Sequence, residues 1–443
     1  MSEGEKVWTP GLFGDDYYGS YSEGSSVVPG VSGMYRWVIS PRWYLNGEWE
    51  YTYSRNKSAT WDKTGETSAI DNGTSESVNS FNFKITPAFF LSPKFTFNYV
   101  LTGDFTSYST DYSGFTTASC VQHRQDIDNN LGFWWNITNS LNVYVSPRLS
   151  ISLWQIEEVK EKQINPSVSA GCGWSADSKL NLNGEVQYNR YSANPNKLNP
   201  VLVRSSELMW LKGNPYLHNL DMWSGYLGIN YLPFNRLSFS MHNSYSRTNG
   251  GTLFEYSPMD AENGGLLKTA YNTSSSDIFS STLGVNTSFF NRKLTLHLQG
   301  SYNYTNESLT RADMHTFNWS ADASYTFGNV RLTLNYRSPM KSLSNGGRQT
   351  TRISSHFDAS LIYGWKNFYM DVTIINIFHK YSKQSVVYQS PHYSFSRENL
   401  SVGRVIGINL TYTFGYGKEI DPRIDASIPD AKTNVLHYNS LSE

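Results

Sequence analysis

Residue types that often carry catalysis or bind metals are sparse and scattered in this chain of 443 residues. The sequence contains no His-Glu-x-x-His, Gly-x-Ser-x-Gly or Walker pattern, the spacings that build zinc, serine-nucleophile and phosphate sites. A carboxylate and histidine site could be assembled from Asp260, Glu262, Asp313 and His315, but any chain rich in loops offers such a set. We therefore expect no enzyme, no metal site and no cofactor.

The two cysteines, Cys120 and Cys172, are too few for a disulfide framework or a four-cysteine zinc site. Cys172 shares its parity with Ile164, Val168 and Trp174, which places it on an apolar face. Cys120 falls in a polar stretch that we expect to be a loop. The sequence therefore predicts no disulfide between them.

Composition narrows the class of protein. Charged residues make up 16% of the chain and the formal net charge is -1, so no basic stripe is available to neutralise nucleic acid. No window of about 18 apolar residues occurs, which excludes a membrane-spanning helix. A barrel of half-apolar strands remains possible. The first twenty residues lack a secretory signal, so an exported protein would need a segment ahead of Met1.

The elements that would position any site are strands. In residues 293–305, KLTLHLQGSYNYT, Leu and Tyr occupy one parity, whereas Thr, His, Gln, Ser and Asn occupy the other. Such alternation predicts a strand with one apolar and one polar face. The repeated pattern predicts about seventeen strands: 32–41, 43–56, 76–89, 94–106, 126–137, 141–155, 163–175, 179–192, 221–232, 236–248, 277–290, 293–308, 312–327, 329–339, 351–364, 366–380 and 401–415.

The connections between these strands alternate between short and long. Short turns such as 138–140 and 233–235 are followed by long loops, which we expect at 57–75, 107–125, 193–220, 249–276 and 381–400. Tyr and Trp gather near the strand ends, as in aromatic girdles at two membrane interfaces. These features predict an antiparallel transmembrane β-barrel with lipid outside and water inside.

A β-sandwich is the alternative explanation of the same alternation, with the aromatic residues filling its core. A sandwich exposes its polar face to bulk water and resembles ordinary globular chains, which carry roughly 25% charged residues. This chain carries 16%, and its polar parity is dominated by Asn, Ser, Thr and Gln. The composition favours the barrel.

The strand count predicts the arrangement along the chain. If the short turns are periplasmic, residues 1–30 form an extracellular loop or a truncated start, unless residues 5–20 hide one further strand. The barrel then covers 31–415, and a polar periplasmic tail covers 416–443. Single-chain barrels of this kind have an even number of strands, so we interpret the chain as the C-terminal portion of a longer protein.

Three segments carry a family resemblance: LKGNPYLHNLDMWSGYLGINYLP (211–233), DVTIINIFHK (371–380) and GRVIGINLTYTFGYGKEI (403–420). In order and spacing they resemble the C-terminal barrel of TonB-dependent receptors, within the outer membrane β-barrel family. That resemblance implies a 22-stranded plugged barrel in the outer membrane of a Gram-negative bacterium. The plug, the segment that engages the TonB complex and about five strands would be absent from this chain. It also implies outer-membrane lipid as a partner and allows a surface lipoprotein to cap the barrel.

The last predicted strand has a second interpretation. Gly407, Leu410 and Tyr412 fit the Gly-x-x-hydrophobe-x-aromatic signal that resembling proteins present to the barrel-assembly machinery, and Phe414 continues the apolar parity. Val405 stands where that signal has a polar residue, and a tail follows the aromatic. The alternative interpretation, in which this segment is a closing strand and carries no separate assembly signal, therefore remains open.

Two functions fit this chain. The first is TonB-dependent uptake of a scarce ligand, and the second is a passive porin-like or structural barrel. A porin normally carries segregated basic and acidic residues at a constriction, and no loop here clusters both. For the importer, candidate ligand contacts are aromatic residues of the expected loops: Trp61, Tyr108, Tyr112, Trp210, Tyr216, Phe254 and Tyr256. In the GNPYL segment, Gly213, Asn214 and Pro215 are turn formers, and a loop bend is its default interpretation.

Overall fold

A computed structural model describes residues 7–13, 16–40, 42–64, 67–92, 94–206, 209–259, 265–272 and 275–414. These residues form 27 strands and one short 3-10 turn, η1 (Pro195–Lys197). Among these described residues, no helix is long and apolar enough to span a membrane. The predicted tail, 416–443, lies outside the described residues.

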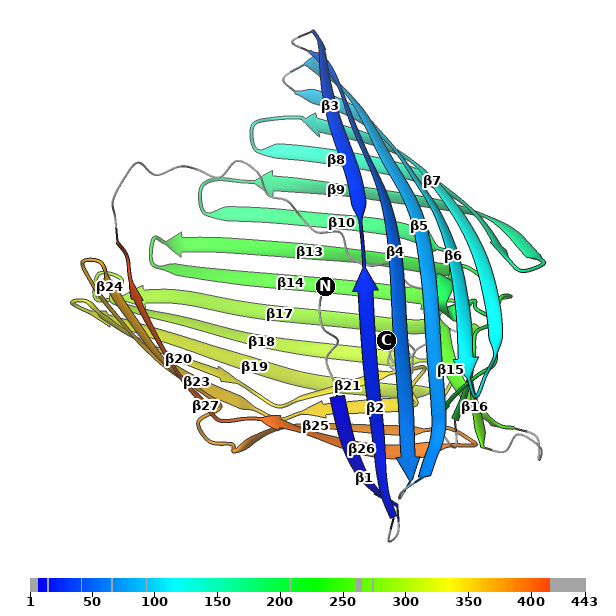
Figure 1. The fold of residues 1–443 in the computed structure, drawn as a ribbon. Coiled ribbons are helices and arrows are strands. Elements are labelled where there is room, and N and C mark those ends of the chain that lie inside the picture. Colours follow the sequence, from blue (N-terminus) through cyan, green and yellow to red (C-terminus); the bar gives the residue numbers. More distant parts are fainter. Residues whose placement is uncertain are drawn as a thin grey trace.

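Nineteen of the strands form one antiparallel sheet that curls round on itself (Figure 1). Its first half contains β1 (Val7–Phe13), β2 (Asp16–Val27), β3 (Gly30–Ser40), β4 (Trp43–Thr64), β5 (Thr67–Ser92), β6 (Phe95–Gly114), β7 (Ala118–Asn136), β8 (Leu141–Ile156), β9 (Val159–Ser175) and β10 (Leu180–Tyr191). Its second half contains β13 (Leu220–Phe234), β14 (Leu237–Asn249), β17 (Ser275–Phe289), β18 (Leu294–Glu307), β19 (Ala312–Phe327), β20 (Val330–Arg337), β23 (His356–Trp365), β24 (Phe368–Ile375) and β27 (Val405–Tyr412). All seventeen predicted strands are present.

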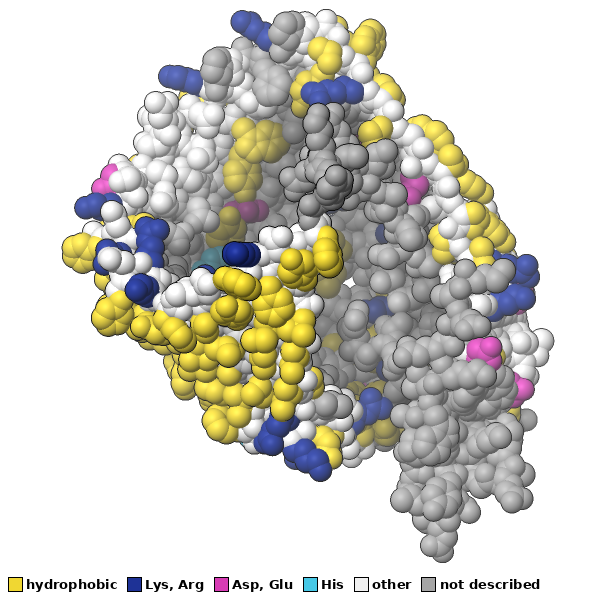
Figure 2. All heavy atoms as spheres, turned by 60° about the vertical axis from the view of Figure 1, so that its left-hand side comes forward, with side chains coloured by type: hydrophobic (Ala, Val, Ile, Leu, Met, Phe, Trp, Pro, Cys, Tyr) yellow, Lys and Arg dark blue, Asp and Glu magenta, His cyan; other side chains and the backbone are white. Residues whose placement is uncertain are grey.

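The register gives the large sheet its two faces. Tyr302 of β18 lies opposite Phe317 of β19, whereas the adjacent pair is Ser301 opposite Asn318. Because side chains alternate across a strand, the aromatic pair points outward and the polar pair points into the hollow. In Figure 2, hydrophobic side chains gather in a continuous patch bordered by Lys and Arg, and the molecule is hollowed beside it.

The remaining eight strands form two four-stranded sheets at the end opposite the short turns. The first contains β11 (Val203–Ser206), β12 (Met209–Lys212), β15 (Thr252–Pro258) and β16 (Leu266–Asn272). The second contains β21 (Met340–Ser344), β22 (Gln349–Ile353), β25 (Tyr381–Gln389) and β26 (Ser394–Val402). We call these two sheets together with residues 193–219 the cap, and we call the other end of the barrel the turn end.

The described strands do not join into a closed ring. Among the described residues, β27 pairs with β24 alone and β3 pairs with β4 alone. β2 and β3 lie end to end along β4, where Val27 faces Arg55 and Gly30 faces Thr52. Pro29 falls at this break and cannot donate a backbone hydrogen bond to a ladder.

Several expectations about the connections are wrong. Residues 7–13 and 16–27 form the hairpin of β1 and β2, which pairs with β4. The loop expected there is therefore wrong, and the alternative of a strand within residues 5–20 agrees with the structure. The expected loops 57–75 and 107–125 are largely strand, since β4 and β5 run for 22 and 26 residues and β6 and β7 for 20 and 19. Backbone pairing with a neighbour continues beyond the apolar section of a strand, so the alternation pattern underestimates strand length.

Cys120 also differs from the prediction. It lies within β7 and is fully buried rather than in a polar loop, because the cap covers it. Cys172 is exposed on the outward parity of β9, as predicted, and both thiols are free.

Candidate functional site

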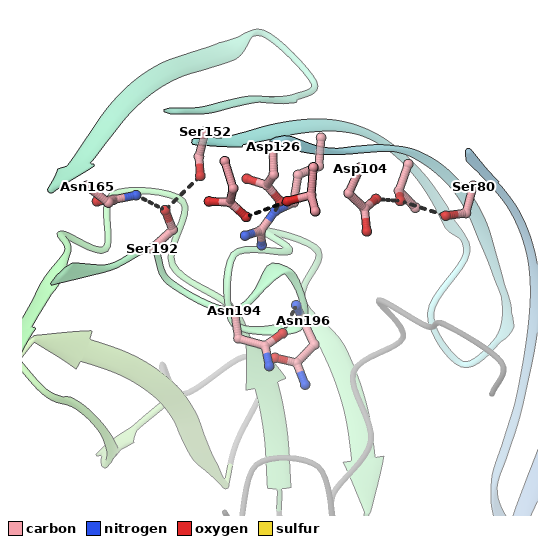
Figure 3. A network of polar contacts seen from close by, with 12 residues as sticks. Ser80, Asp104, Asp126, Ser152, Asn165, Ser192, Asn194 and Asn196 are labelled. Carbon is pink, nitrogen blue, oxygen red and sulfur yellow. Dashed lines mark hydrogen bonds and ion pairs between the residues drawn. The ribbon is translucent and has the colours of Figure 1, made fainter. Parts of the chain in front are cut away.

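Hydrogen-bonded polar side chains line the hollow on the inward parity of β5 to β9 (Figure 3). Thr106 Oγ1 donates to Asp104 Oδ1, and its oxygen lies 3.2 Å from Ser80 Oγ. Asp104 lies directly opposite Asp126 on β7, and the Arg124 guanidinium forms an ion pair with Asp126. Two facing carboxylates repel each other, so this cation reduces the cost of that arrangement.

A second branch of the network holds the cap connections to the barrel wall. Ser192, just after β10, donates from Oγ to Ser152 Oγ at 3.1 Å and accepts from Asn165 Nδ2 at 2.8 Å. Asn219, just before β13, donates to Asn165 Oδ1 at 2.6 Å. The chain therefore leaves the barrel at Ser192 and re-enters it at Asn219 beside the same buried residue, Asn165.

Two hollows have volumes of about 430 and 610 Å³: the smaller is lined by residues of β13 to β20, and the larger, on β3 to β7, is acidic. It is lined by four carboxylates and one lysine: Glu48, Glu50, Asp104, Asp128 and Lys84. Lys84 Nζ lies 3.8 Å from Glu48, and Arg148 forms an ion pair of 2.8 Å with Asp128. The cavity therefore keeps carboxylates in excess over the basic groups that neutralise them.

The cap has a hydrophobic core of its own, which rests on the wall. Cys120, Trp154 and Ile156 of the wall pack with Leu211 and Leu217 of the cap in one buried cluster. Burial raises the pKa of the Cys120 thiol to about 11. This core holds residues from three long connections together, although they are far apart in the sequence.

Aromatic rings join the two small sheets. Tyr388 stacks on Phe395 with centroids 5.5 Å apart, and it meets Tyr256 of the other sheet at 5.2 Å. Tyr256 also contacts Tyr393 at 4.5 Å. Such ring pairs contribute roughly 0.5–1.5 kcal/mol each beyond area burial.

Lys268 of β16 is buried against this cluster, with 4% of its surface exposed. Its ammonium lies 5.0 Å from the ring centre of Phe254 and 5.8 Å from that of Tyr256. Burial lowers the pKa of Lys268 from 10.5 to about 8, because the charged form loses water. The rings partly replace that water through cation–π attraction.

The GNPYL segment is anchored as a bend. Gly213 N donates to Asn199 O at 2.8 Å, and Asn214 Oδ1 accepts from Tyr216 N at 3.0 Å. Leu217 then enters the cap core, whereas Tyr216 points outward with 68% of its surface exposed. This geometry agrees with the turn interpretation of the segment.

The structure separates the predicted ligand contacts into two groups. Tyr216 is exposed, whereas five others are buried, with 3% to 6% exposed: Tyr108, Tyr112, Trp210, Phe254 and Tyr256. The side chain of Trp61 lies outside the described part of the chain. Buried rings can reach a ligand only if the cap rearranges. Ligand contact therefore stays a prediction, and Tyr216 is the most accessible of the predicted contacts.

The predicted closing-strand residues lie as the alternation indicates. Leu410, Tyr412 and Phe414 are exposed on one parity, and Gly407 lies on the other, opposite Thr373. Tyr412 and Phe414 form an edge-to-face pair with centroids 4.8 Å apart. Recognition of this edge strand by an assembly machinery stays a prediction.

Sequence reasoning missed several residues that shape the cap, including Tyr388, Tyr393, Phe395, Arg348 and Lys268. The aromatic density of 381–400 was a usable signal for the first three. No local pattern could have indicated that Arg348 meets Glu255, because the two residues lie in different connections. Among the described residues, no group of three or more His, Cys, Asp or Glu could hold a metal ion.

The model of the outer membrane protein beta-barrel family matches residues 152–412, more than half of the chain. The chain belongs to this family. No curated protein matches it. The matched region begins within β8 and ends with β27, so it includes the cap and most of the large sheet.

Solved structures share the fold of this family member. The copper transporter OprC has a TM-score of 0.68 and 11% identity, and the match covers 90% of this chain and 70% of OprC. The ferric citrate transporter FecA, in its unliganded form, has a TM-score of 0.58 and 11% identity over 90% of this chain and 62% of FecA. The siderophore receptor PirA from Pseudomonas aeruginosa has a TM-score of 0.52 and 11% identity over 91% of this chain and 75% of PirA. The expected likeness to a TonB-dependent receptor barrel is confirmed at the level of the fold.

Proposed function

We propose that this outer membrane protein is the barrel of a TonB-dependent receptor that imports a scarce ligand, with the cap facing the outside of the cell. The observation that carries the proposal is the joint arrangement of a polar, hydrogen-bonded lumen and a folded cap over one end of it. A lumen lined with hydrogen-bonding groups suits a polar plug and a hydrated passage. The cap suits selection of a ligand before it reaches the lumen.

Partners follow from this arrangement. Lipid would contact the outward apolar face, and a plug supplied by another part of the protein would contact the polar network around Asp104, Asp126 and Asn165. The TonB complex would act on that plug, and the assembly machinery would engage β27. The cap surface around Tyr216 is where we place the ligand or a surface lipoprotein. We expect no catalysis.

Conductance and uptake together test the proposal. The full-length gene product in planar bilayers is expected to stay closed, because a plug fills the lumen. Cells that depend on the protein for a copper or ferric siderophore supplement are expected to lose growth when TonB is deleted. Steady conductance together with TonB-independent growth would instead establish a passive pore.

A further inference from the structure

On several strands, the outward-facing residues form an apolar column, that is, every second residue along the strand. Toward the cap, these columns end in Lys or Arg. On β4, Trp49, Tyr51 and Tyr53 are followed on the same parity by Arg55 and Lys57. On β9, Val168 and Ile164 are followed toward the cap by Lys162 and Lys160. On β10 and β14 the columns end at Arg190 and Arg247. We call these basic side chains on β4, β9, β10 and β14 the basic rim.

Tyrosine hydroxyls mark the level at which the apolar band ends. Tyr188 donates to Asp221 at 2.7 Å, and Tyr245 donates to Asp277 at 2.6 Å. Tyr51 donates to Asn79 at 3.0 Å in the same way. Tyrosine with an apolar ring and a satisfied hydroxyl is the residue expected at a membrane interface. The basic rim therefore begins where hydrocarbon gives way to lipid headgroups.

Two members of the rim are already paired. Arg190 Nε lies 3.5 Å from Asp221, and Arg247 Nε lies 3.9 Å from Asp277. In each case the arginine lies directly opposite the aspartate on the neighbouring strand. These pairs fix the arginines but largely balance their charge.

Arg55 and Lys57 differ, because among the described residues neither takes part in an ion pair with the carboxylates nearby. Both are exposed, and they line a depression of about 510 Å³ on the outward surface. Lys57 has serine directly opposite it on both sides, Ser25 on β2 and Ser75 on β5. Ammonium, guanidinium and hydroxyl donors around one hollow match the acceptor oxygens of a phosphate.

Two carboxylates, Glu23 and Asp111, also line the depression. They balance the formal charge of the hollow but do not remove its donors. A divalent cation held by these carboxylates is compatible with a phosphate on the basic side. The site therefore fits a phosphate group better than it fits a headgroup without acceptor oxygens.

We infer that the depression lined by Arg55, Lys57, Ser25 and Ser75 binds the phosphate group of a phosphorylated outer-leaflet lipid whose chains lie along the apolar column of β4. This inference rests on the proposed orientation, with the cap toward the outside. Its occupant is a membrane lipid and is distinct from the imported ligand. The apolar column and the phosphate site are on one strand, so a single lipid can occupy both.

The test is binding of diphosphoryl lipid A to the purified full chain in neutral detergent, measured by native mass spectrometry. Arg55→Gln/Lys57→Gln is expected to weaken binding roughly 30-fold, because the variant removes two cationic groups that face the phosphate. Lys179→Gln/Lys293→Gln removes the same charge at the turn end and is expected to leave the affinity unchanged. Arg55→Lys keeps the charge and is expected to retain most of the binding.

Competing outcomes are separable. Equal binding of dephosphorylated lipid A, or equal weakening in the turn-end control, would overturn the phosphate site. If inorganic phosphate binds as tightly as the lipid, the depression is a general anion site, and this result would also contradict the inference. Because the readout is lipid binding, failure of ligand uptake in cells would bear on the proposed function alone. Far-ultraviolet circular dichroism checks that each variant is folded.

Discussion

Arg348 Nη2 donates to Glu255 Oε1 at 3.3 Å and so joins the turn after β21 to β15 of the other small sheet. The Arg348 side chain is only 10% exposed, whereas Glu255 is 36% exposed. Together with the contact between Tyr256 and Tyr388, this ion pair makes the two sheets one body. Any motion of the cap over the lumen is therefore expected to carry both sheets together.

Arg348→Met is expected to loosen the cap, because it leaves the half-buried Glu255 without its partner. The loss corresponds to about 1–2 kcal/mol, or roughly a tenfold increase in transient opening. The measurement is the maleimide labelling rate of Cys120, which is buried in the cap core, in a Cys172→Ser background. Arg352→Met is the control, because Arg352 is exposed on β22. Equal labelling of both variants would contradict the role of the ion pair.

Tyr388→Ala is expected to open the cap further, because Tyr388 is 1% exposed and contacts rings from both small sheets. Truncating a buried aromatic residue typically costs about 3–5 kcal/mol. Tyr388→Phe keeps the ring and removes the hydroxyl, which donates to Phe254 O at 3.4 Å and also interacts with Arg348, so it is expected to be milder than the Ala variant. The maleimide labelling rate of Cys120 compares the two variants. If Tyr388→Phe is labelled as fast as Tyr388→Ala, the effect comes from the hydroxyl and not from the ring.

The cap is expected to become more stable as the pH rises from about 8 to 10.5, because burial holds the pKa of Lys268 at about 8. In this window the unfolded cap keeps the proton that the folded cap has lost, so the unfolded form binds more protons and stability increases with pH. Below pH 8 both forms are charged and the full desolvation cost remains. The difference corresponds to about 3 kcal/mol.

Lys268→Met is expected to remove this pH dependence and to raise stability at pH 7. The measurement is urea-induced opening of the cap, followed by a fluorophore on Tyr216→Cys in a Cys172→Ser background. Tyr216 is exposed, so the label does not disturb the core. A Lys268→Met variant that keeps the rise between pH 8 and 10.5 would assign the titration to another group.

Leu283→Arg is expected to impair insertion of the barrel, because Leu283 is 56% exposed on the outward face of β17. An arginine facing the bilayer midplane costs about 2–4 kcal/mol. Thr282→Arg is the matched control, since Thr282 is the adjacent residue and hydrogen-bonds inward to Ser301. The folded fraction in vesicles, resolved by heat-modified migration on gels, should fall for the first variant only. If instead Thr282→Arg lowers the folded fraction and Leu283→Arg does not, the assignment of the outward and inward faces is wrong.

Much of the barrel is predictable because the signal is local. The alternation of Leu296 and Leu298 with His297 and Gln299 is visible in one short segment, and a strand with one apolar face is its direct consequence. The same parity places Cys172 outward and the closing-strand residues Leu410 and Tyr412 on a common face. The matching family region, 152–412, includes all of these residues.

The cap is not predictable in this way, because its contacts join residues far apart in the chain. Met209 pairs in parallel with Leu266, and Tyr256 meets Tyr388, across distances that no alternation pattern records. The predicted ligand contacts are aromatic residues of expected loops, and five of them are buried. Tyr108 and Tyr112 belong to β6, whereas Trp210, Phe254 and Tyr256 lie on long connections that pack with one another in the cap.

The sequence by itself determined the strands, their two faces and short turns such as 138–140 and 233–235, because side-chain parity and turn chemistry act over a few residues. Only the tertiary structure decided that the long connections fold into a cap, that Cys120 lies beneath it and that Arg55 and Lys57 share a hollow with serines from two neighbouring strands. Those outcomes depend on register and on burial between distant segments, which a one-dimensional pattern does not contain.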